Sequence, residues 1–336
     1  MTPSKPLLAL ILATAFSAPL AAQTIIPAQP MVPAETVDQI PFPAPAFLQF
    51  VLDGQPQRMA FFDFRPAGVP KGTVLLLHGK NFASDYWTPA IAGLLDAGYR
   101  VIAPDKLGFG QSSKPGRAYT FELLAANTAT LLDSLKIGKA AVIGNSMGGM
   151  LAVHFARRYP DRVTKLILEN PLGLENYKPA IPPQTNADLI KLEMAQTTDS
   201  YSKFLHGYFP VWKPEYERFV QAFARTQSAP GYADVARASA QTYQMIYDGP
   251  IVDDLPKLTM PTLLIIGQKD RTVFGRRFAP PDAIKGLGDF PALGKAAAKS
   301  IPKARLVEIP ESGHVPHLET PETFIAAVTE FLGNEQ

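Results

Sequence analysis

The chain has 336 residues, of which 46% are hydrophobic and 18% are charged, and its formal net charge is +2. This balance is typical of a globular protein, and the length suits one large domain or one domain with an insertion. The lysines and arginines form no long basic run, so nucleic acid is not an expected partner. The chain has no cysteine, which excludes a cysteine nucleophile, a disulfide bond and a thiolate metal site.

The N-terminal segment has the layout of a secretory signal peptide. Lys5 precedes an apolar stretch from Leu7 to Phe16, small residues follow, and cleavage is expected after Ala22. The alternative is a membrane anchor, but the stretch is short for a span of about 20 residues. We therefore expect residues 1–22 to be removed, the mature protein to be periplasmic or secreted, and no stable membrane span to remain.

Residues 23–46 are rich in proline, alanine and glutamine and predict an extended arm without a core of its own. Two strands are expected next, over 47–52 and 58–64, joined by a turn. A buried strand (73–79), a helix (84–97) and a second apolar strand (99–105) follow. A helix is then predicted over 120–136, because apolar residues recur there at helical spacing and Thr120 is a suitable N-cap.

Strand and helix continue to alternate through a strand at 140–144, a helix at 147–160 and a strand at 163–170. Residues 171–255 break the pattern, being rich in proline and aromatic residues without a clear buried strand. Strands resume at 261–270 and 304–310, and a final helix over 321–332 has Pro321 in its first turn. Residues 271–303 carry no clear pattern. This order predicts an α/β fold, with a mostly parallel sheet formed by residues 47–170 and 256–336 and a mainly helical cap formed by 171–255.

A serine stands between the predicted strand at 140–144 and the predicted helix at 147–160. Gly144, Ser146 and Gly148 form a G-x-S-x-G pentapeptide. In that context the pattern predicts a nucleophile elbow, a sharp turn that lifts the hydroxyl out of the sheet edge. Small residues are needed on both sides because strand and helix approach closely there. The alternative is a tight turn in which the serine only caps the helix.

A serine hydroxyl needs a base to act as a nucleophile at neutral pH. Of the five histidines, we expect His314 to be that base, because it follows the last strand in a loop that Gly313 allows to turn. His317, in the same loop, is the rival. The other three are expected elsewhere: His78 at the end of a strand, His154 inside a helix, and His206 in the cap, where it is a candidate pocket residue.

The base in turn needs a carboxylate to orient it. Asp270 ends the strand at 261–270 at the carboxyl edge of the sheet, and is the expected acid. Glu169 ends the preceding strand and is the alternative. The expected catalytic order along the chain is thus Ser146, Asp270, His314.

Five segments, from about residue 47 to 333, resemble successive motifs of the α/β-hydrolase superfamily: LLLHGKNF, VIAPDKLGFGQSSKP, IGNSMGGMLAVHFARRYPDRV, LLIIGQKDRTV and ESGHVPHLETPE. The resemblance implies a triad of Ser146, His314 and Asp270. It also implies an oxyanion hole formed by the backbone N–H groups of Met147 and Lys80. Asn81 and Phe82, in the same loop as Lys80, are expected to line the pocket floor.

The elbow carries a serine where epoxide hydrolases and haloalkane dehalogenases of this superfamily carry an aspartate, which indicates acyl chemistry. We expect hydrolysis of a carboxylic ester of a small molecule through an acyl-enzyme, with no cofactor and no metal ion. The alternatives are a lactone, an N-terminal proline amide or a carbon–carbon bond as the target, and, more remotely, a non-catalytic binding protein. Four cations are either solvated or face an anionic substrate: Lys80, Arg271, Arg276 and Arg277.

Overall fold

A computed structural model of the chain describes residues 24–26 and 42–334. The predicted signal peptide, residues 1–22, lies outside the described residues, and so does most of the predicted arm. Within the arm, residues 24–26 form a short strand that the sequence does not predict. It pairs antiparallel with the strand over residues 46–52, so this part of the arm extends the sheet.

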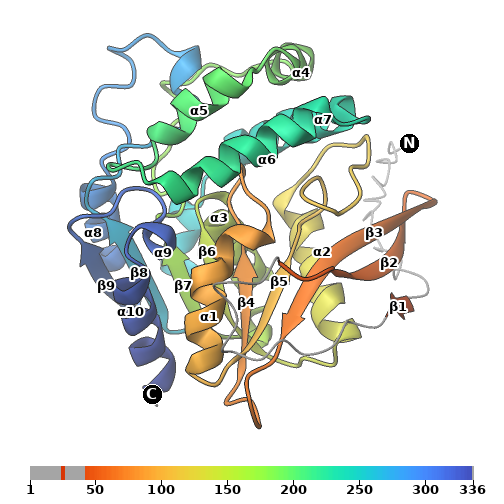
Figure 1. Cartoon of the computed structure of the whole chain (residues 1–336). Coiled ribbons are helices and arrows are strands. Elements are labelled where there is room, and N and C mark those ends of the chain that lie inside the picture. The colour runs from red at the N-terminus through yellow and green to blue at the C-terminus, as the bar shows by residue number, and fades with distance from the viewer. Residues whose placement is uncertain (1–23, 27–41, 335–336) are drawn as a thin grey trace, which may run out of the picture.

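Nine strands form one sheet in the order β1-β2-β3-β5-β4-β6-β7-β8-β9 (Figure 1). Strands β4 to β9 pair in parallel with their neighbours, whereas β1, β2 and β3 form an antiparallel extension that joins the sheet at β5. The mostly parallel sheet predicted from the alternation is therefore confirmed. The strands are β1 (Thr24–Ile26), β2 (Ala46–Leu52), β3 (Gln55–Phe64), β4 (Thr73–Leu77), β5 (Arg100–Pro104), β6 (Ala140–Asn145), β7 (Val163–Glu169), β8 (Thr262–Gly267) and β9 (Ala304–Ile309).

Helices cover both faces of the sheet, as Figure 1 shows. Alternate residues of each central strand face opposite ways: Leu75 and Leu77 pack with α2 and α3, and Val74 and Leu76 pack with α1 and α10. The described helices are α1 (Thr88–Asp96), α2 (Phe121–Ser134), α3 (Met147–Arg158), α4 (Asn186–Met194), α5 (Thr198–His206), α6 (Glu217–Ser228), α7 (Tyr232–Asp248), α8 (Phe290–Ser300), α9 (Pro316–Glu319) and α10 (Pro321–Gly333).

The predicted core helices form close to the expected residues. Thr120 caps α2 by accepting a hydrogen bond from the N–H of Leu123 at 3.1 Å, and Pro321 lies in the first turn of α10. The helix expected over 84–97 begins instead as a 3₁₀ turn, η2 (Ser84–Trp87), and becomes α-helical at Thr88. Helix α8 lies in the stretch for which the sequence predicts no element. It covers β8 and β9 with Phe290, Gly294 and Ala297.

Helices α4 to α7 lie between β7 and β8 in the chain and form a layer above the carboxyl ends of the parallel strands (Figure 1). They pack as two pairs, α4 with α7 and α5 with α6. Threonine side chains cap the first two of these helices. Thr185 is the N-cap of α4, and Thr197 forms a capping box with Ser200 at the start of α5. The cap is thus an ordered layer whose lower surface faces the end of β6, where Ser146 lies.

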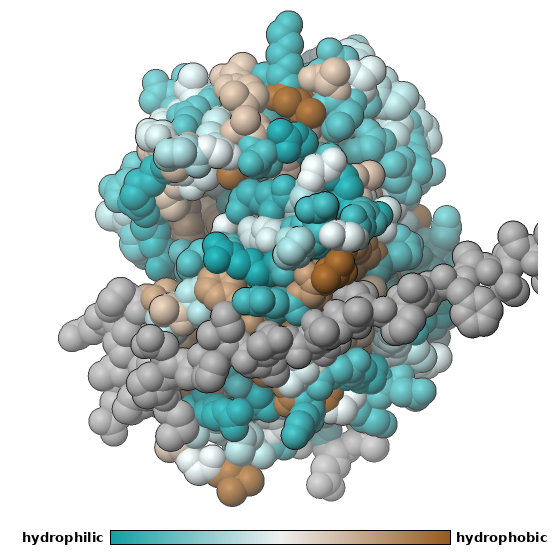
Figure 2. Space-filling view, turned by 90° about the vertical axis from the view of Figure 1, so that its right-hand side faces the viewer, coloured by the Kyte–Doolittle hydropathy of each residue, from teal (hydrophilic) through white to brown (hydrophobic). Residues whose placement is uncertain are grey.

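Figure 2 shows the face of the molecule that lies to the right in Figure 1. The coloured part of this face is mostly hydrophilic, and its apolar residues are scattered. Scattered apolar residues are normal for a protein surface. None of the helices in residues 42–334 has the length and apolar character needed to cross a membrane.

Candidate active site

Ser146 lies on a strained turn between β6 and α3. Its backbone has φ 55° and ψ −122°, which is unusual for a residue with a side chain. A Cβ on Gly144 would overlap the backbone of Gly148, and a Cβ on Gly148 would overlap the carbonyl oxygen of Leu77. Both flanking glycines are therefore required by the close approach of strand and helix, as the pentapeptide predicts.

His314 and Asp270 form a buried pair beside this turn. The Nδ1–H of His314 donates to Oδ2 of Asp270 at 2.7 Å. Asn145, the residue before Ser146, donates its Nδ2–H to the His314 carbonyl at 3.0 Å and so holds the histidine loop next to the turn. The Nε2 atom of His314 is buried with no hydrogen-bond partner in the described part of the chain, and no hydrogen bond there joins it to Ser146.

Asp270 is held as a carboxylate. Burial alone would raise its pKa, but the facing imidazole of His314 and hydrogen bonds from His314 and Thr272 together lower the pKa below its ordinary value. Asn170 also donates its Nδ2–H to Oδ2 at 2.7 Å. Sequence reasoning missed Asn170, although it follows the end of β7 as Asp270 follows the end of β8.

The alternative acid and the alternative base pair with each other instead. Glu169 lies 2.8 Å from Nδ1 of His317 and accepts the backbone N–H of the same residue at 2.7 Å. The His317 ring stacks on Trp87, at 4.0 Å between ring centroids, and lies perpendicular to the ring of Tyr86 at 4.5 Å. The structure therefore brings His314 to Asp270 and not to Glu169, and it encloses His317 in the core.

Hydrogen bonds from three successive backbone N–H groups hold the His314 loop in place. Glu319 accepts the N–H of Gly313 with one carboxylate oxygen and the N–H of Val315 with the other, each at 2.9 Å. The N–H of His314 itself donates to the carbonyl of Tyr208, in the cap, at 2.9 Å. Sequence reasoning missed both residues. Glu319 gave a signal, since a lone acid five residues after the histidine can reach back to its loop.

Two backbone N–H groups beside Ser146 are free. Neither the N–H of Met147 nor that of Lys80 has an acceptor among the described residues. The loop that carries Lys80 is braced by Tyr86, whose hydroxyl accepts the N–H of Gly79 at 3.0 Å and donates to Oδ1 of Asn145 at 3.2 Å. The predicted oxyanion donors are thus unpaired and belong to braced backbone.

His78 has a structural part in the same loop. Its Nδ1–H donates to the Gly79 carbonyl at 2.8 Å, and its Nε2 accepts the N–H of Lys106 at 3.2 Å. Burial, together with the nearby Lys106 ammonium, lowers the pKa of His78 well below its ordinary value. A neutral imidazole with one donor and one acceptor fits both contacts.

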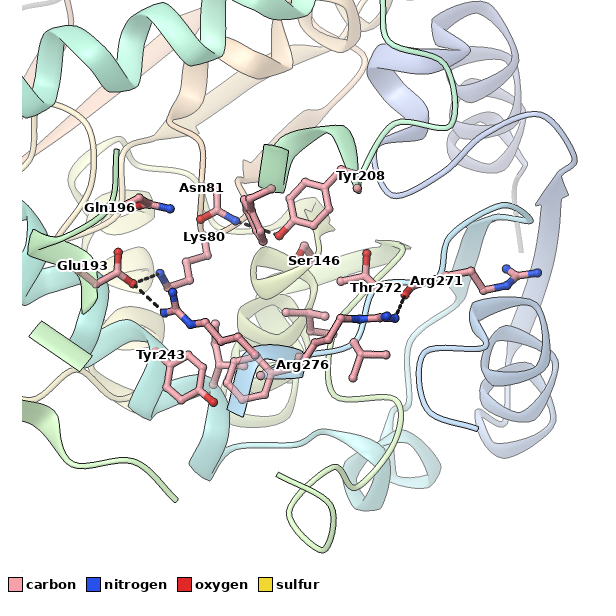
Figure 3. Close-up of a pocket in the computed structure, with 18 residues that line it drawn as sticks. Lys80, Asn81, Ser146, Glu193, Gln196, Tyr208, Tyr243, Arg271, Thr272 and Arg276 are labelled. Atoms are coloured by element: carbon pink, nitrogen blue, oxygen red, sulfur yellow. Dashed lines mark hydrogen bonds and ion pairs between the residues drawn. The ribbon is translucent and has the colours of Figure 1, made fainter. Parts of the chain in front are cut away.

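A cavity of about 640 Å³ opens onto Ser146 under the cap (Figure 3). Its wall combines apolar side chains with four cations and one acid. The lining residues are Lys80, Asn81, Ser146, Leu172, Glu193, Gln196, Phe204, Gly207, Tyr208, Tyr243, Ile246, Arg271, Thr272, Val273, Phe274, Gly275, Arg276 and Arg277. The cavity is large enough for a small organic substrate.

Of the three residues predicted to line the pocket, only Asn81 does so, donating its Nδ2–H to the Tyr208 hydroxyl at 2.9 Å. The prediction for Phe82 is wrong, because its ring stacks on Tyr86 in the core. The prediction for His206 is also wrong. Its ring stacks on Trp212, and its Nδ1–H donates to the Ser202 carbonyl on the outer side of α5.

The Lys80 side chain is neither solvated nor free for a ligand. Its ammonium lies 3.2 Å from Oε1 of Glu193 and 2.5 Å from Oγ of Ser239. It therefore ties the loop after β4 to helices α4 and α7 of the cap. Among residues 24–26 and 42–334, no group of three or more histidine and acidic side chains is arranged to hold a metal ion.

A strained serine at a strand–helix turn, under a helical cap on a mostly parallel sheet, defines the class of α/β-fold hydrolases. The family model described as the alpha/beta hydrolase fold matches residues 72–321. The chain belongs to this family.

Three relatives illustrate its range. A solved structure of a probable hydrolytic enzyme from Pseudomonas aeruginosa is 43% identical, with a TM-score of 0.84, and the match covers 86% of this chain and 94% of that one. A putative non-heme chloroperoxidase from Synechocystis is 31% identical over 63% of this chain and 77% of its own length. A 2-hydroxy-6-oxo-2,4-heptadienoate hydrolase from Pseudomonas putida is 26% identical over 78% of this chain and 89% of its own length.

Proposed function

We propose that this chain is a serine hydrolase that cleaves carboxylic esters through an acyl-enzyme on Ser146. The observation that carries the proposal is the strained Ser146 turn at the mouth of the cavity, with the His314–Asp270 pair buried beside it. To attack a carbonyl carbon, a serine needs a turn that presents its hydroxyl to the substrate, a base that takes its proton, and an acid that orients the base.

In the first half of the reaction, Ser146 Oγ attacks the ester carbonyl carbon and its proton passes to Nε2 of His314. The N–H groups of Met147 and Lys80 donate to the oxyanion. When the intermediate collapses, the carbon–oxygen bond to the alcohol breaks, and the alcohol leaves with the proton from His314. In an unliganded enzyme the serine–histidine hydrogen bond is often long and tightens on substrate binding.

In the second half, His314 takes a proton from water, and the resulting nucleophile attacks the acyl-enzyme. Collapse of this second intermediate releases the carboxylic acid and returns the proton to Ser146. Asp270 stays ionised throughout and holds Nδ1–H in place, which leaves Nε2 as the atom that exchanges protons. Every proton transfer in these two halves takes place between His314 and Ser146, water or the leaving alcohol.

The test is a panel of p-nitrophenyl esters of increasing chain length, with Ser146→Ala as the blank. Turnover that disappears in Ser146→Ala supports the proposal, and activity that survives overturns Ser146 as the nucleophile. A fluorophosphonate probe that labels wild type but not Ser146→Ala gives an independent readout. If the probe leaves wild type unlabelled, the non-catalytic binding protein becomes the better interpretation.

A second candidate reaction is hydrolysis of a carbon–carbon bond, supported by the similarity to the Pseudomonas putida dienoate hydrolase. Loss of the absorbance of a 2-hydroxy-6-oxodienoate, without turnover of any ester, favours this candidate. Turnover of a lactone, without turnover of any ester, favours the remaining alternative, in which the same residues hydrolyse a lactone. The cations of the cavity disfavour an N-terminal proline amide, because its substrate carries an ammonium group.

We also propose that the protein is exported and that cleavage follows Ala22, on the pattern of residues 1–22 alone. N-terminal sequencing of the protein from a periplasmic fraction tests this. A first residue of Gln23 supports export, and a cytoplasmic protein that keeps Met1 rejects it.

A further inference from the structure

The charges that line the cavity are unbalanced. Its described lining includes the cations Lys80, Arg271, Arg276 and Arg277, against the single acid Glu193. Figure 3 shows Lys80 and Glu193 on one side of Ser146, and Arg271 and Arg276 on the other. The two sides differ in how far their charges are neutralised.

On the first side an acid neutralises part of the positive charge. Oε1 of Glu193 lies 3.2 Å from the Lys80 ammonium and 3.8 Å from the Arg277 guanidinium. The Lys80 ammonium also donates to Ser239. One carboxylate therefore serves two cations here, so this side keeps one net positive charge, which lies close to the carboxylate of Glu193.

On the second side neither arginine pairs with a carboxylate of the described residues, since the carboxylate of the adjacent Asp270 pairs with His314. Arg276 donates one N–H to the Arg271 carbonyl at 3.2 Å and has no acidic partner among the described residues. Arg271 donates to the carbonyls of Gln268 and Asp270, and its side chain leads away from Ser146 (Figure 3). Both arginines lack an acidic partner in the described part of the chain, and Arg276, which is exposed, is the one whose side chain does not lead away from Ser146 (Figure 3).

The backbone presents Arg276 from a constrained turn. Gly275 has φ 70° and begins the 3₁₀ turn η6 (Arg276–Phe278). A Cβ at Gly275 would lie 2.6 Å from Ile181 and 2.7 Å from the Tyr243 hydroxyl, so glycine is needed at that position. This fit against the cap holds the start of η6 at the cavity wall.

One hydroxyl group beside this turn lacks a partner. The hydroxyl of Tyr243 is buried without a hydrogen bond in the described residues, and the Tyr243 side chain lines the cavity. Buried polar groups are usually paired, so an unpaired donor in a cavity wall indicates a missing acceptor. Leu172, Ile246 and Val273 make other parts of the wall apolar.

We propose that Arg276 binds a free carboxylate at the far end of the substrate's acyl chain, so that the preferred substrate is a half-ester of a dicarboxylic acid. The guanidinium of Arg276 pairs with the carboxylate, and the apolar wall packs against the chain between the two carbonyl groups. The inference rests on the proposed function, because it names the acid that Ser146 would carry as the acyl-enzyme.

The test compares p-nitrophenyl hydrogen adipate with its primary amide, which is neutral and of equal size. Adipate is long enough that its own carboxylate does not rapidly expel the leaving group. Wild type is expected to have about tenfold higher kcat/KM for the acid, the size of one charge-assisted hydrogen bond, through a lower KM. Arg276→Gln should lose this preference, and added salt should weaken it in wild type.

Arg225→Gln is the matched control, since it removes the same charge from an exposed site on α6 outside the cavity lining. It should keep the preference. Equal rates for acid and amide in wild type, or an equal loss for both substrates in Arg276→Gln, would overturn the proposal. Half-esters of longer diacids then measure the distance from Ser146 to the carboxylate.

A binding experiment distinguishes failure of the anion site from failure of the proposed ester hydrolysis. Calorimetry on Ser146→Ala with monomethyl adipate should give binding that is about tenfold weaker in the Ser146→Ala, Arg276→Gln double variant. If wild type hydrolyses no ester but this difference appears, the anion site stands and the ester assignment fails. If ester turnover is present and the difference is absent, the anion site fails alone.

Discussion

Asn170 donates its side-chain N–H to the same carboxylate oxygen of Asp270 that accepts the Nδ1–H of His314, and both contacts are 2.7 Å long. Asn170 has φ 37° and its Oδ1 accepts the N–H of Gly267 at 3.0 Å. One side chain therefore joins the ends of β7 and β8 and fixes the acid of the pair. Asparagine suits this position because it tolerates left-handed backbone.

Replacing Asn170 should slow acylation. Asn170→Gly removes both hydrogen bonds without backbone strain, and we expect kcat on a p-nitrophenyl ester to fall about tenfold, as for loss of one hydrogen bond to a charged group. Asn170→Ala should lose as much activity and also melt at a lower temperature, because alanine in left-handed backbone adds about 1 kcal/mol. Full activity in Asn170→Gly would show that Asn170 supports only the turn.

The pH dependence of stability should report on Asp270. Its pKa in the folded protein lies below the ordinary value of an aspartate, so its ionisation stabilises the folded state. This contribution is present above about pH 4 and is lost as the pH falls through the folded pKa. Urea unfolding of wild type and Asp270→Asn should therefore differ most at neutral pH and converge in acid.

Ser146→Ala is the control for that experiment, since it should follow the wild-type pH curve. A gap between wild type and Asp270→Asn that widens in acid would contradict the assignment. The same Asp270→Asn variant should lose about 10²–10⁴-fold in kcat, because the imidazole is then held in the wrong tautomer.

Glu319→Gln should misplace His314. The carboxylate accepts two backbone N–H groups, whereas an amide offers one oxygen and turns an NH₂ group toward the other N–H. We expect about tenfold slower labelling of Ser146 by a fluorophosphonate, the effect of losing one hydrogen bond to a charged group. Glu311→Gln changes an exposed acid in the same loop that pairs with Lys269, and it should label at the wild-type rate.

Gly148→Ala should destabilise the elbow. The added methyl group would overlap the backbone oxygens of Leu77 and His78, which no side-chain movement relieves. A loss of about 3 kcal/mol in the free energy of unfolding is expected, at the upper end for overpacked sites. Gly138→Ala is the control, because a methyl group there meets nothing within 4 Å. Equal melting temperatures for the two variants would show that the elbow can relax.

Glu193→Gln should increase the attraction of the cavity for anions. It removes the acid that pairs with Lys80 and Arg277 and leaves both cations without that neutralisation. We expect the ratio of kcat/KM for the adipate half-ester to that for its amide to rise a few-fold, as for a pair near the protein surface. An unchanged ratio would mean that these two cations do not contact the acyl chain.

Much of this architecture follows from local patterns in the chain. Alternating apolar strands and helices predict the parallel sheet, and the small residues around Ser146 predict a turn that only glycine on both sides permits. These patterns are recognised from residues close in sequence, so they can be identified without the fold, although the backbone that excludes a side chain at Gly148 belongs to the distant Leu77 and His78. The acid, the base and the serine could be ordered for the same reason, since each follows the end of a strand.

Other features depend on which strand ends become neighbours in space. The choice of Asp270 over Glu169 follows from pairings across 44 residues, for His314 with Asp270, and 148 residues, for His317 with Glu169. Helix α8 was not predicted because its short apolar face becomes buried only when β8 and β9 are in place. The errors at Phe82 and His206 have the same origin, because aromatic partners in distant segments decide which way those rings face.

The chain by itself therefore determined the sheet, the elbow and the three residue types of the site, because each depends on spacing and backbone sterics. The tertiary structure decided which acid meets which histidine, and that Asn170, Glu319 and Tyr208 hold them. It also decided which cations stay unpaired in the cavity. Those outcomes are set by hydrogen bonds and charges between segments far apart in sequence, and only the packed fold brings such segments within reach of each other.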